Sequence, residues 1–266
     1  MLTRTDVDGD CRIVCSTTQY RSVSFTSVAS WSASASVVRS NVSRMSRNPT
    51  GAHGGYREDI VLPGDSEGPA PAGADAVAAS TLPMNALTAR LALDQMALRP
   101  GAVLAVTGAA GAFGGYVVQL ARADGLTVVA DASEADEDLV RTLGADVVVR
   151  RGDDVAARIR EHFSGGVDGL ADGAVQDALV LPAVRDGGAV ATVRGYRGDG
   201  QRGVRMFPTL VRRVAQDRPA LDRLRRQAQD GVLTLRVART FAAEQAADAH
   251  RELARGGVRG RLVLTF

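Results

Sequence analysis

The fold is decided by Val103-Leu-Ala-Val-Thr-Gly-Ala-Ala-Gly-Ala-Phe-Gly-Gly-Tyr-Val-Val-Gln-Leu-Ala-Arg122. Its first residues, 103–106, form a short apolar run typical of a buried strand, and a glycine-rich turn and an apolar helix follow. A strand, a glycine turn and a helix in this order form the first half of a dinucleotide-binding βαβ unit. Gly108, Gly111 and Gly114 would allow the tight exit from the strand, the close approach of backbone to a diphosphate, and contact between helix and sheet.

A second predicted strand, 126–130, strengthens this interpretation because it ends in Asp131. Asp131 lies about 20 residues beyond the glycines, where an acid that binds the ribose hydroxyls is expected. The start of the predicted helix would present N–H groups and a partial positive charge to the phosphates. The alternative is an ordinary glycine-rich turn in another kind of α/β protein.

Short apolar strands alternate with helices over the middle of the chain. This alternation predicts an α/β protein with a doubly wound parallel sheet, whose strands end at one edge where ligands bind. The predicted strands are 103–106, 126–130, 146–149, 166–170 and 188–193, and the predicted helices between them are 133–143, 153–163 and 174–184.

The flanking segments are less regular. A helix is predicted from Asp75 or Ser80 to Leu98, where Pro100 and Gly101 end it. The basic stretch 208–231 is interpreted as helical, with arginines that form a solvated face or, as the less favoured alternative, a nucleic-acid patch. The remaining predictions are a strand over 56–62, a loop over 68–73, a strand over 233–237, a helix over 242–254 and a strand over 260–265.

Composition excludes several classes of function. The formal net charge is only +2, so charge gives no argument for nucleic-acid binding. The chain contains no Lys, which excludes a Lys Schiff base, and its three His residues are far apart, so a Cys/His zinc site is not supported. No apolar run approaches the length of a membrane helix. With only Cys11 and Cys15, a reduced cytoplasmic setting is the expectation.

The N-terminal segment 1–53 does not resemble the rest of the chain. Between Cys11 and Thr50 it is rich in Ser and Arg, lacks Asp and Glu, and shows no hydrophobic periodicity. This composition is found in organelle transit peptides. A disordered leader, or a start region read in an unproductive frame, is the favoured interpretation.

From about Gly54 to Phe266 the chain resembles the zinc-free medium-chain dehydrogenase/reductases, specifically the quinone oxidoreductases related to zeta-crystallin. Six pieces with matching order and spacing carry the resemblance. They are Gly-Gly-Tyr-x-Glu (54–58), Thr-Leu-Pro-Met-Asn-Ala-Leu-Thr-Ala (81–89), Gly-Ala-Ala-Gly-Ala-Phe-Gly (108–114), Leu-Gly-Ala-Asp (143–146), Asp-Gly-Gly (186–188) and Arg-Gly-Arg-Leu-Val-Leu (259–264).

The resemblance implies a zinc-independent, nicotinamide-dependent reductase that transfers hydride to a small-molecule quinone or α,β-unsaturated carbonyl, and it allows a homodimer. The hydride chemistry belongs to the cofactor, and no catalytic acid or base is identified. Thr88 and Gly195 would lie near the nicotinamide, and Arg261 is either near the cofactor or a surface charge. The glycine turn, Gly108, Ala109, Ala110, Gly111, Ala112, Phe113 and Gly114, would hold the diphosphate.

The choice between NADP and NAD is open from the residues. Asp131 would accept from both ribose hydroxyls and repel a 2′-phosphate, which favours NAD. Arg150 and Arg151 follow the third predicted strand, where the family places its 2′-phosphate contacts, and two guanidiniums could bind a phosphate in forked geometry. The family habit favours NADP, although the arginine pair could simply neutralise Asp131 and Asp153.

The chain departs from the family in its N-terminal half, where the early strands of a GroES-like catalytic domain are not recognisable in the sequence. The expected organisation is the leader 1–53, a remnant of that domain over 54–80, a Rossmann dinucleotide-binding domain over 81–232, and a C-terminal return to the catalytic domain over 233–266. A non-catalytic dinucleotide-binding protein is therefore the alternative to an active reductase.

Overall fold

The computed structural model describes residues 2–5, 11–14, 36–38 and 67–266. The chain divides into two compact units: one contains Met1–Leu87 and Val211–Phe266, and the other contains Thr88–Leu210. The predicted dinucleotide-binding segment 81–232 is thus wider than the second unit at both ends. In the described ranges, none of the helices combines the length and apolarity that crossing a membrane requires.

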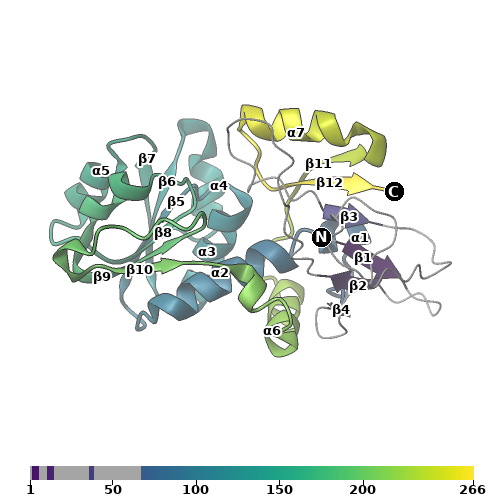
Figure 1. The fold of residues 1–266 in the computed structure, drawn as a ribbon, viewed down its shortest axis with the longest axis horizontal. Coiled ribbons are helices and arrows are strands. Elements are labelled where there is room, and N and C mark those ends of the chain that lie inside the picture. The colour runs from purple at the N-terminus through teal and green to yellow at the C-terminus, as the bar shows by residue number, and fades with distance from the viewer. Residues whose placement is uncertain (1, 6–10, 15–35, 39–66) are drawn as a thin grey trace. The chain divides into compact units, whose positions relative to one another are not determined.

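The unit Thr88–Leu210 contains a parallel six-stranded sheet with the order β7-β6-β5-β8-β9-β10 (Figure 1). The chain runs outward from the central strand β5 to β7, returns to β8 beside β5, and continues outward to β10. This is the doubly wound strand order of dinucleotide-binding folds, so the predicted α/β fold class is confirmed. The strands are β5 (Val103–Thr107), β6 (Thr127–Ala132), β7 (Val147–Arg150), β8 (Val167–Asp172), β9 (Val184–Thr192) and β10 (Arg205–Pro208).

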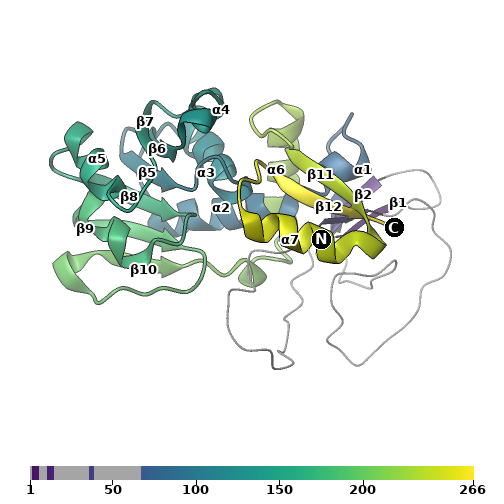
Figure 2. The same cartoon turned by 90° about the horizontal axis from the view of Figure 1, so that it is seen from above.

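Helices cover both faces of this sheet. Because crossovers between parallel strands are right-handed, reversing the direction of winding moves the connecting helices to the other face. Accordingly α3 (Ala112–Ala123) and α4 (Glu137–Thr142) lie on one side of the sheet and α5 (Val155–His162) lies on the other (Figures 1 and 2). On the α5 side, Val155 and Ile159 pack with buried strand residues such as Leu170 and Val190.

The predicted helix over 174–184 is wrong in type. The structure has a 3₁₀ helix there, Asp177–Ala183, with Pro182 inside it. Val175 and Asp177 have φ of +60° and +53°, so the chain turns in the left-handed region just before the 3₁₀ helix and at its first residue. Left-handed residues cannot continue an α-helix, and Pro182 lacks the N–H that one would need.

An unpredicted strand, β10, leads into the basic segment. It lies at the edge of the sheet beside β9, where Pro208 is tolerated because one side of the strand has no neighbouring strand to donate a hydrogen bond to.

The predicted continuous helix over 208–231 is also wrong: α6 (Arg218–Gln229) begins only where Asp217 caps it by accepting from Ala220 N at 3.0 Å. Leu221 and Leu224 form the buried side of α6.

The predicted helix from residue 75 or 80 to 98 is two helices. Asp75 caps the short α1 (Ala76–Ala79) by accepting from Ala78 N at 2.7 Å, and α2 (Pro83–Met96) follows. Pro83 explains the interruption, because proline suits the first position of a helix but not its interior. The predicted loop over 68–73 begins with a short strand, β4 (Glu67–Pro69), which pairs with β2 (Cys11–Val14) at a sheet edge. The predicted strand 56–62 lies outside the described residues.

The other unit contains a six-stranded sheet with the order β11-β12-β3-β1-β2-β4. Three of its strands, β1 (Leu2–Thr5), β2 (Cys11–Val14) and β3 (Ser36–Val38), fall in the predicted leader 1–53, so the expectation that this segment lacks strands is wrong at these positions. Strands of three or four residues are too short to show a readable alternation. The rest of the leader lies outside the described residues.

The C-terminal residues contribute β11 (Val237–Ala242), α7 (Ala246–Arg255) and β12 (Arg261–Thr265). The final strand is confirmed, whereas β11 begins where the predicted strand 233–237 was expected to end. α7 begins later than the predicted helix 242–254, because 243–245 form a 3₁₀ turn. Phe241, Ala249, Leu262 and Leu264 form a buried cluster between these elements.

Candidate functional site

The glycine turn lies where β5 passes into α3, next to the point at which the winding of the sheet reverses. Gly108 has a φ of +66°, which favours glycine. A Cβ on Gly114 would lie 2.3 Å from the carbonyl oxygen of Gly108, and one on Gly111 would lie 3.1 Å from the same oxygen. The turn therefore has no room for a side chain at Gly114, and a side chain at Gly111 would fit only if the neighbouring backbone moved slightly.

The start of α3 is suited to an anion by its charge. Gly111 is its N-cap residue and makes no side-chain hydrogen bond to the helix, and α3 has no acidic residue in its first turn. The backbone N–H groups of a first helical turn point outward along the axis and carry a partial positive charge. Ala112 and Phe113, the first residues of α3, therefore offer their N–H groups to an anionic group at the turn.

Polar side chains tie the ends of β5 and β8 together at this point. The hydroxyl of Thr107 donates to Asp172 Oδ1 at 2.7 Å and accepts from Ala174 N at 3.3 Å. Asp172, which is 1% exposed, also accepts from Asp177 N at 2.8 Å. A Cβ on Gly173 would lie 2.7 Å from Thr107 O, so glycine is required for this close approach.

Asp131, predicted to contact the ribose, is turned into the protein instead. It lies near the end of β6, is 5% exposed, and its Oδ1 accepts from the backbone N–H of Ala109 at 3.1 Å. Burial raises its pKa above the ordinary value, with a further increase from the negative charge of Asp172. The N–H groups of Ala109 and Gly108 and the charge of Arg151 oppose this increase.

The predicted 2′-phosphate residues lie at the end of the neighbouring strand. Arg150 is the last residue of β7 and pairs in register with Ala132 of β6. Its guanidinium is half-exposed and lies 3.2 Å from the exposed carboxylate of Glu134. Arg151 is exposed, and its backbone N–H donates to Ala132 O at 2.8 Å. The structure thus brings both guanidiniums to the strand edge that also carries the glycine turn and Asp131.

Three other predicted residues are less directly connected to the turn. Gly195 follows β9 with a φ of +84°, in a turn that the Thr192 hydroxyl closes by donating to Tyr196 O at 2.9 Å. Thr88 is half-buried within α2. Arg261 begins β12 in the other unit and is buried there. The roles of these three residues at a cofactor stay predictions.

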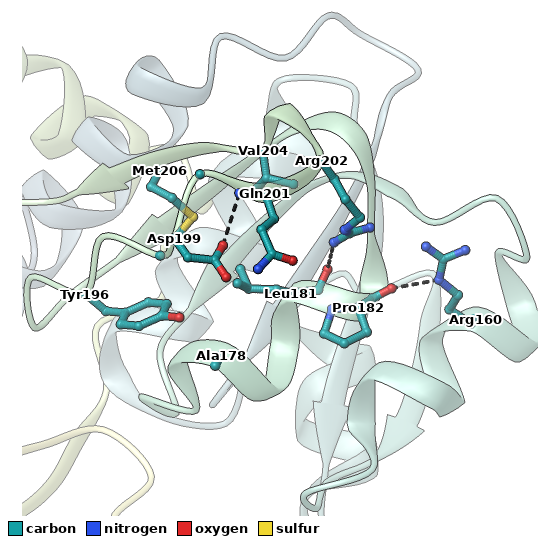
Figure 3. A pocket seen from close by; sticks show the side chains of 12 residues that line it. Arg160, Ala178, Leu181, Pro182, Tyr196, Asp199, Gln201, Arg202, Val204 and Met206 are labelled. Atoms are coloured by element: carbon teal, nitrogen blue, oxygen red, sulfur yellow. Dashed lines mark hydrogen bonds between the residues drawn. The ribbon is translucent and has the colours of Figure 1, made fainter.

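A cavity of about 500 Å³ lies elsewhere in the unit Thr88–Leu210 (Figure 3). Its walls come from the 3₁₀ helix, the connection from β9 to β10, and Arg160 of α5. Two lining guanidiniums are held by backbone oxygens: Arg160 Nε donates to Pro182 O at 2.7 Å, and Arg202 donates to Leu181 O at 2.6 Å. None of the predicted site residues lines this cavity, although Tyr196 next to Gly195 does.

Thr107 and Asp172 were not predicted as site residues. The signal was present, because Asp172 is a charged residue at the end of an apolar run and precedes a glycine. A charge at that end of a parallel strand faces the edge where ligands bind. Among the residues that the structure describes, no group of three or more His, Cys, Asp or Glu side chains is placed to hold a metal ion.

The strand order and the glycine turn at the reversal of winding define the class of the protein: a doubly wound dinucleotide-binding fold. Residues 143–264 match the family model described as zinc-binding dehydrogenase. The Bacillus subtilis (strain 168) protein named "Putative quinone oxidoreductase YhfP" is 33% identical over 172 residues, 61% of this chain and 51% of that protein. Residues 143–264 thus match a zinc-binding dehydrogenase domain of the medium-chain dehydrogenase/reductase superfamily, and quinone oxidoreductases are among the homologues of the chain.

Solved structures agree with this assignment. An NAD-dependent alcohol dehydrogenase has a TM-score of 0.69 and 27% identity, over 81% of this chain and 66% of the other. The quinone oxidoreductase of Coxiella burnetii has a TM-score of 0.67 and 25% identity, over 76% of this chain and 64% of the other. The chain spans about half the length of the Bacillus subtilis relative.

Proposed function

We propose that this protein is an NADPH-dependent reductase that transfers hydride to a quinone or an α,β-unsaturated carbonyl. The observation that carries the proposal is the glycine N-cap and acid-free first turn of α3, directly after a turn in which glycines make close backbone contacts. The diphosphate of a dinucleotide fits this cradle, because it needs close backbone approach and N–H donors rather than a charged side chain. When bound, the nicotinamide supplies the hydride.

Two features of the strand edge favour NADPH over NADH. The carboxylate of Asp131 is buried against Ala109, so it does not present a negative charge at the surface where a 2′-phosphate would lie. Arg150 and Arg151 are at least half-exposed at the end of the adjacent strand. Guanidiniums bind phosphate in a bidentate manner, which makes these two residues the proposed 2′-phosphate contacts.

The proposal also includes a cytoplasmic location, a zinc-independent reaction and a homodimer, all of which rest on the sequence. Thr88, Gly195 and Arg261 complete the proposed cofactor contacts. Binding of a dinucleotide without turnover is the second candidate. It is favoured by the burial of Thr107, Asp131 and Asp172, whose internal hydrogen bonds leave none of them presented as a proton donor to a substrate.

The binding step is tested with Gly111→Asp. The substitution places a carboxylate at the N-cap of α3, where it would take the N–H groups and repel the diphosphate. We expect NADPH affinity, measured by isothermal titration calorimetry, to fall by at least about tenfold. Gly165→Asp is the matched control, since a Cβ at exposed Gly165 has nothing within 4 Å. Equal affinity in the two variants would contradict the proposed site.

Turnover is tested separately by following NADPH oxidation with a simple quinone, and with an enone, in the wild-type protein. Quinone- or enone-dependent oxidation that Gly111→Asp abolishes and Gly165→Asp retains would support the reductase. NADPH binding with no oxidation above the blank would select the second candidate. Absence of both binding and oxidation would reject both candidates.

A further inference from the structure

The carboxylate of Asp131 is positioned as an internal support of the glycine turn. It comes from β6, the strand beside β5, and accepts from the N–H of Ala109, the residue directly after Gly108. The bond joins the second strand of the fold to the turn that leaves the first. At 5% exposure, the carboxylate is enclosed by protein.

Two charged groups from the neighbouring elements face this carboxylate. Asp172, at the end of β8, is negative and is held by Thr107 and the N–H of Asp177. Arg151, which follows β7, is positive and exposed. The N–H groups of Gly108 and Ala109 face it from the turn. A diphosphate at the start of α3 would add negative charge only three residues along the chain from Ala109.

We propose that Asp131 is a positioning residue of the dinucleotide site, whose carboxylate holds the glycine turn through Ala109 instead of binding the ribose. This inference rests on the proposed function and assigns Asp131 a different role from the one predicted. Because the diphosphate and this carboxylate repel each other, the dinucleotide binds more tightly when Asp131 is protonated. Dinucleotide binding is therefore accompanied by proton uptake.

The two roles of Asp131 differ in what they do to cofactor choice. A carboxylate on the ribose hydroxyls favours NAD over NADP, so its removal changes the ratio of the two affinities. A carboxylate on the turn acts on the diphosphate, which NAD and NADP share. Asp131→Asn keeps an oxygen acceptor for the Ala109 N–H and removes the charge, whereas Asp131→Ala removes both.

The support itself is tested without any cofactor, by amide hydrogen exchange of Ala109 measured by NMR. We expect slow exchange in the wild-type protein and in Asp131→Asn, and exchange at least about tenfold faster in Asp131→Ala, a loss of local protection of about 1.4 kcal/mol. Asp168→Asn is the matched control, because Asp168 accepts from Val103 N at the opposite end of β5. Unchanged exchange in Asp131→Ala would overturn the proposal. Should Asp131→Ala fail to fold, loss of protection in Asp131→Asn would overturn it.

The coupling to binding is tested by calorimetric titration of NAD⁺ and NADP⁺ into the wild-type protein and Asp131→Asn. We expect the ratio of the two dissociation constants to be the same in both proteins. The NAD⁺ affinity of the wild-type protein should fall as pH rises through the raised pKa of Asp131, with proton uptake detected from buffers of different ionisation enthalpy, and Asp131→Asn should remove this dependence. NAD⁺ is used because a 2′-phosphate itself titrates near pH 6.

The outcomes separate this inference from the proposed function. If Asp131→Asn shifts the ratio of the two dissociation constants in favour of NADP⁺, Asp131 contacts the ribose as first predicted, and the inference is overturned. If the NAD⁺ affinity of Asp131→Asn still falls as pH rises, the proposed coupling between dinucleotide binding and protonation of Asp131 is overturned. If the wild-type protein binds neither dinucleotide, the proposed function fails, and the exchange of Ala109 alone decides the role of Asp131.

Discussion

At the scale of single residues, the site depends on positions where no side chain fits. A Cβ on Gly114 would lie within 3 Å of three backbone atoms of Gly108 and Ala109, the nearest being Gly108 O at 2.3 Å. Backbone cannot move aside as a flexible side chain does, so Gly114→Ala must displace α3 from the turn. We expect a loss of about 1–3 kcal/mol, or a fall of roughly 3–10 °C in Tm by differential scanning fluorimetry.

Gly165→Ala provides the matched control for this loss. Gly165 is exposed, with no positive φ and no atom within 4 Å of the methyl group that the substitution adds, so its Tm should change by less than about 1 °C. A Tm for Gly114→Ala equal to that of Gly165→Ala would mean that the turn is wider than the structure has it.

The buried carboxylate of Asp131 gives a second prediction, on stability against pH. Burial raises the pKa of Asp131 in the folded protein above 3.8, so the unfolded chain ionises first as pH rises. The folded state therefore loses stability from about pH 4 up to the raised pKa, and the loss persists above it. Asp131→Asn does not lose stability in this way, because asparagine has no carboxyl group to ionise. We expect its Tm, relative to the wild type, to increase as pH rises from about 4 up to the raised pKa of Asp131.

Asp168→Asn should behave in the opposite way. Burial raises the pKa of Asp168, but the Val103 N–H and the Arg185 guanidinium outweigh burial and hold it below the ordinary value. Its stabilisation is therefore present at neutral pH and is lost as pH falls through the folded pKa, so the damage from Asp168→Asn should shrink in acid. Parallel pH profiles for the two variants would contradict both assignments.

At the scale of elements, the connection after β8 stores backbone strain beside the site. Val175 has a φ of +60°, a conformation that a β-branched residue adopts at a cost of about 1–3 kcal/mol. Val175→Gly relieves this strain and costs about 0.5–1 kcal/mol in chain entropy. We expect a net gain of about 1 kcal/mol, seen as a rise of roughly 2–4 °C in Tm.

Val175→Asn separates the relief of backbone strain from the chain-entropy cost of glycine, because asparagine tolerates the left-handed region and keeps a side chain. It should also raise Tm, whereas Val175→Ala should gain less than Val175→Gly. A fall in Tm for both the Gly and Asn variants would show that Val175 does not adopt a positive φ in solution.

The same connection shows what sequence patterns could predict. The strands and helices from Val103 to Asp172 follow the predicted order closely, because each buried strand is a short apolar run and each turn carries glycine or a capping acid. The 3₁₀ helix after Val175 was not predicted, since the left-handed turn before it includes Val175, a β-branched residue that normally avoids such backbone. β10 was missed because an edge strand with Arg205 and Pro208 has no apolar alternation.

The candidate site likewise contains one feature that the sequence could predict and one that it could not. The glycines of the turn were predictable because their spacing reflects a local backbone constraint. The orientation of Asp131 was not predictable, because residues of a strand alternate between its two faces and a shift of one position reverses the direction of a side chain. Tertiary contact with Ala109 decides which way this carboxylate points.

At the scale of the whole molecule, the proposed site belongs to one of two compact units. The turn, Asp131, Arg150 and Arg151 all lie in Thr88–Leu210. A ligand that binds only the folded state stabilises it by RT ln(1 + [L]/Kd), about 2.7 kcal/mol at a hundred times Kd. NADPH should therefore slow amide exchange most strongly in peptides from β5 and α3, as measured by mass spectrometry.

Peptides from β11 and β12 serve as the internal comparison, because these strands belong to the other unit and contain only Arg261 among the predicted cofactor contacts. Protection confined to Thr88–Leu210 would show that this unit alone accounts for binding. Protection that reaches the peptide containing Arg261, and that Arg261→Ala removes, would support the predicted role of that residue at the cofactor. Equal protection in Gly111→Asp would contradict binding at the turn, since that variant should not retain the dinucleotide at this site.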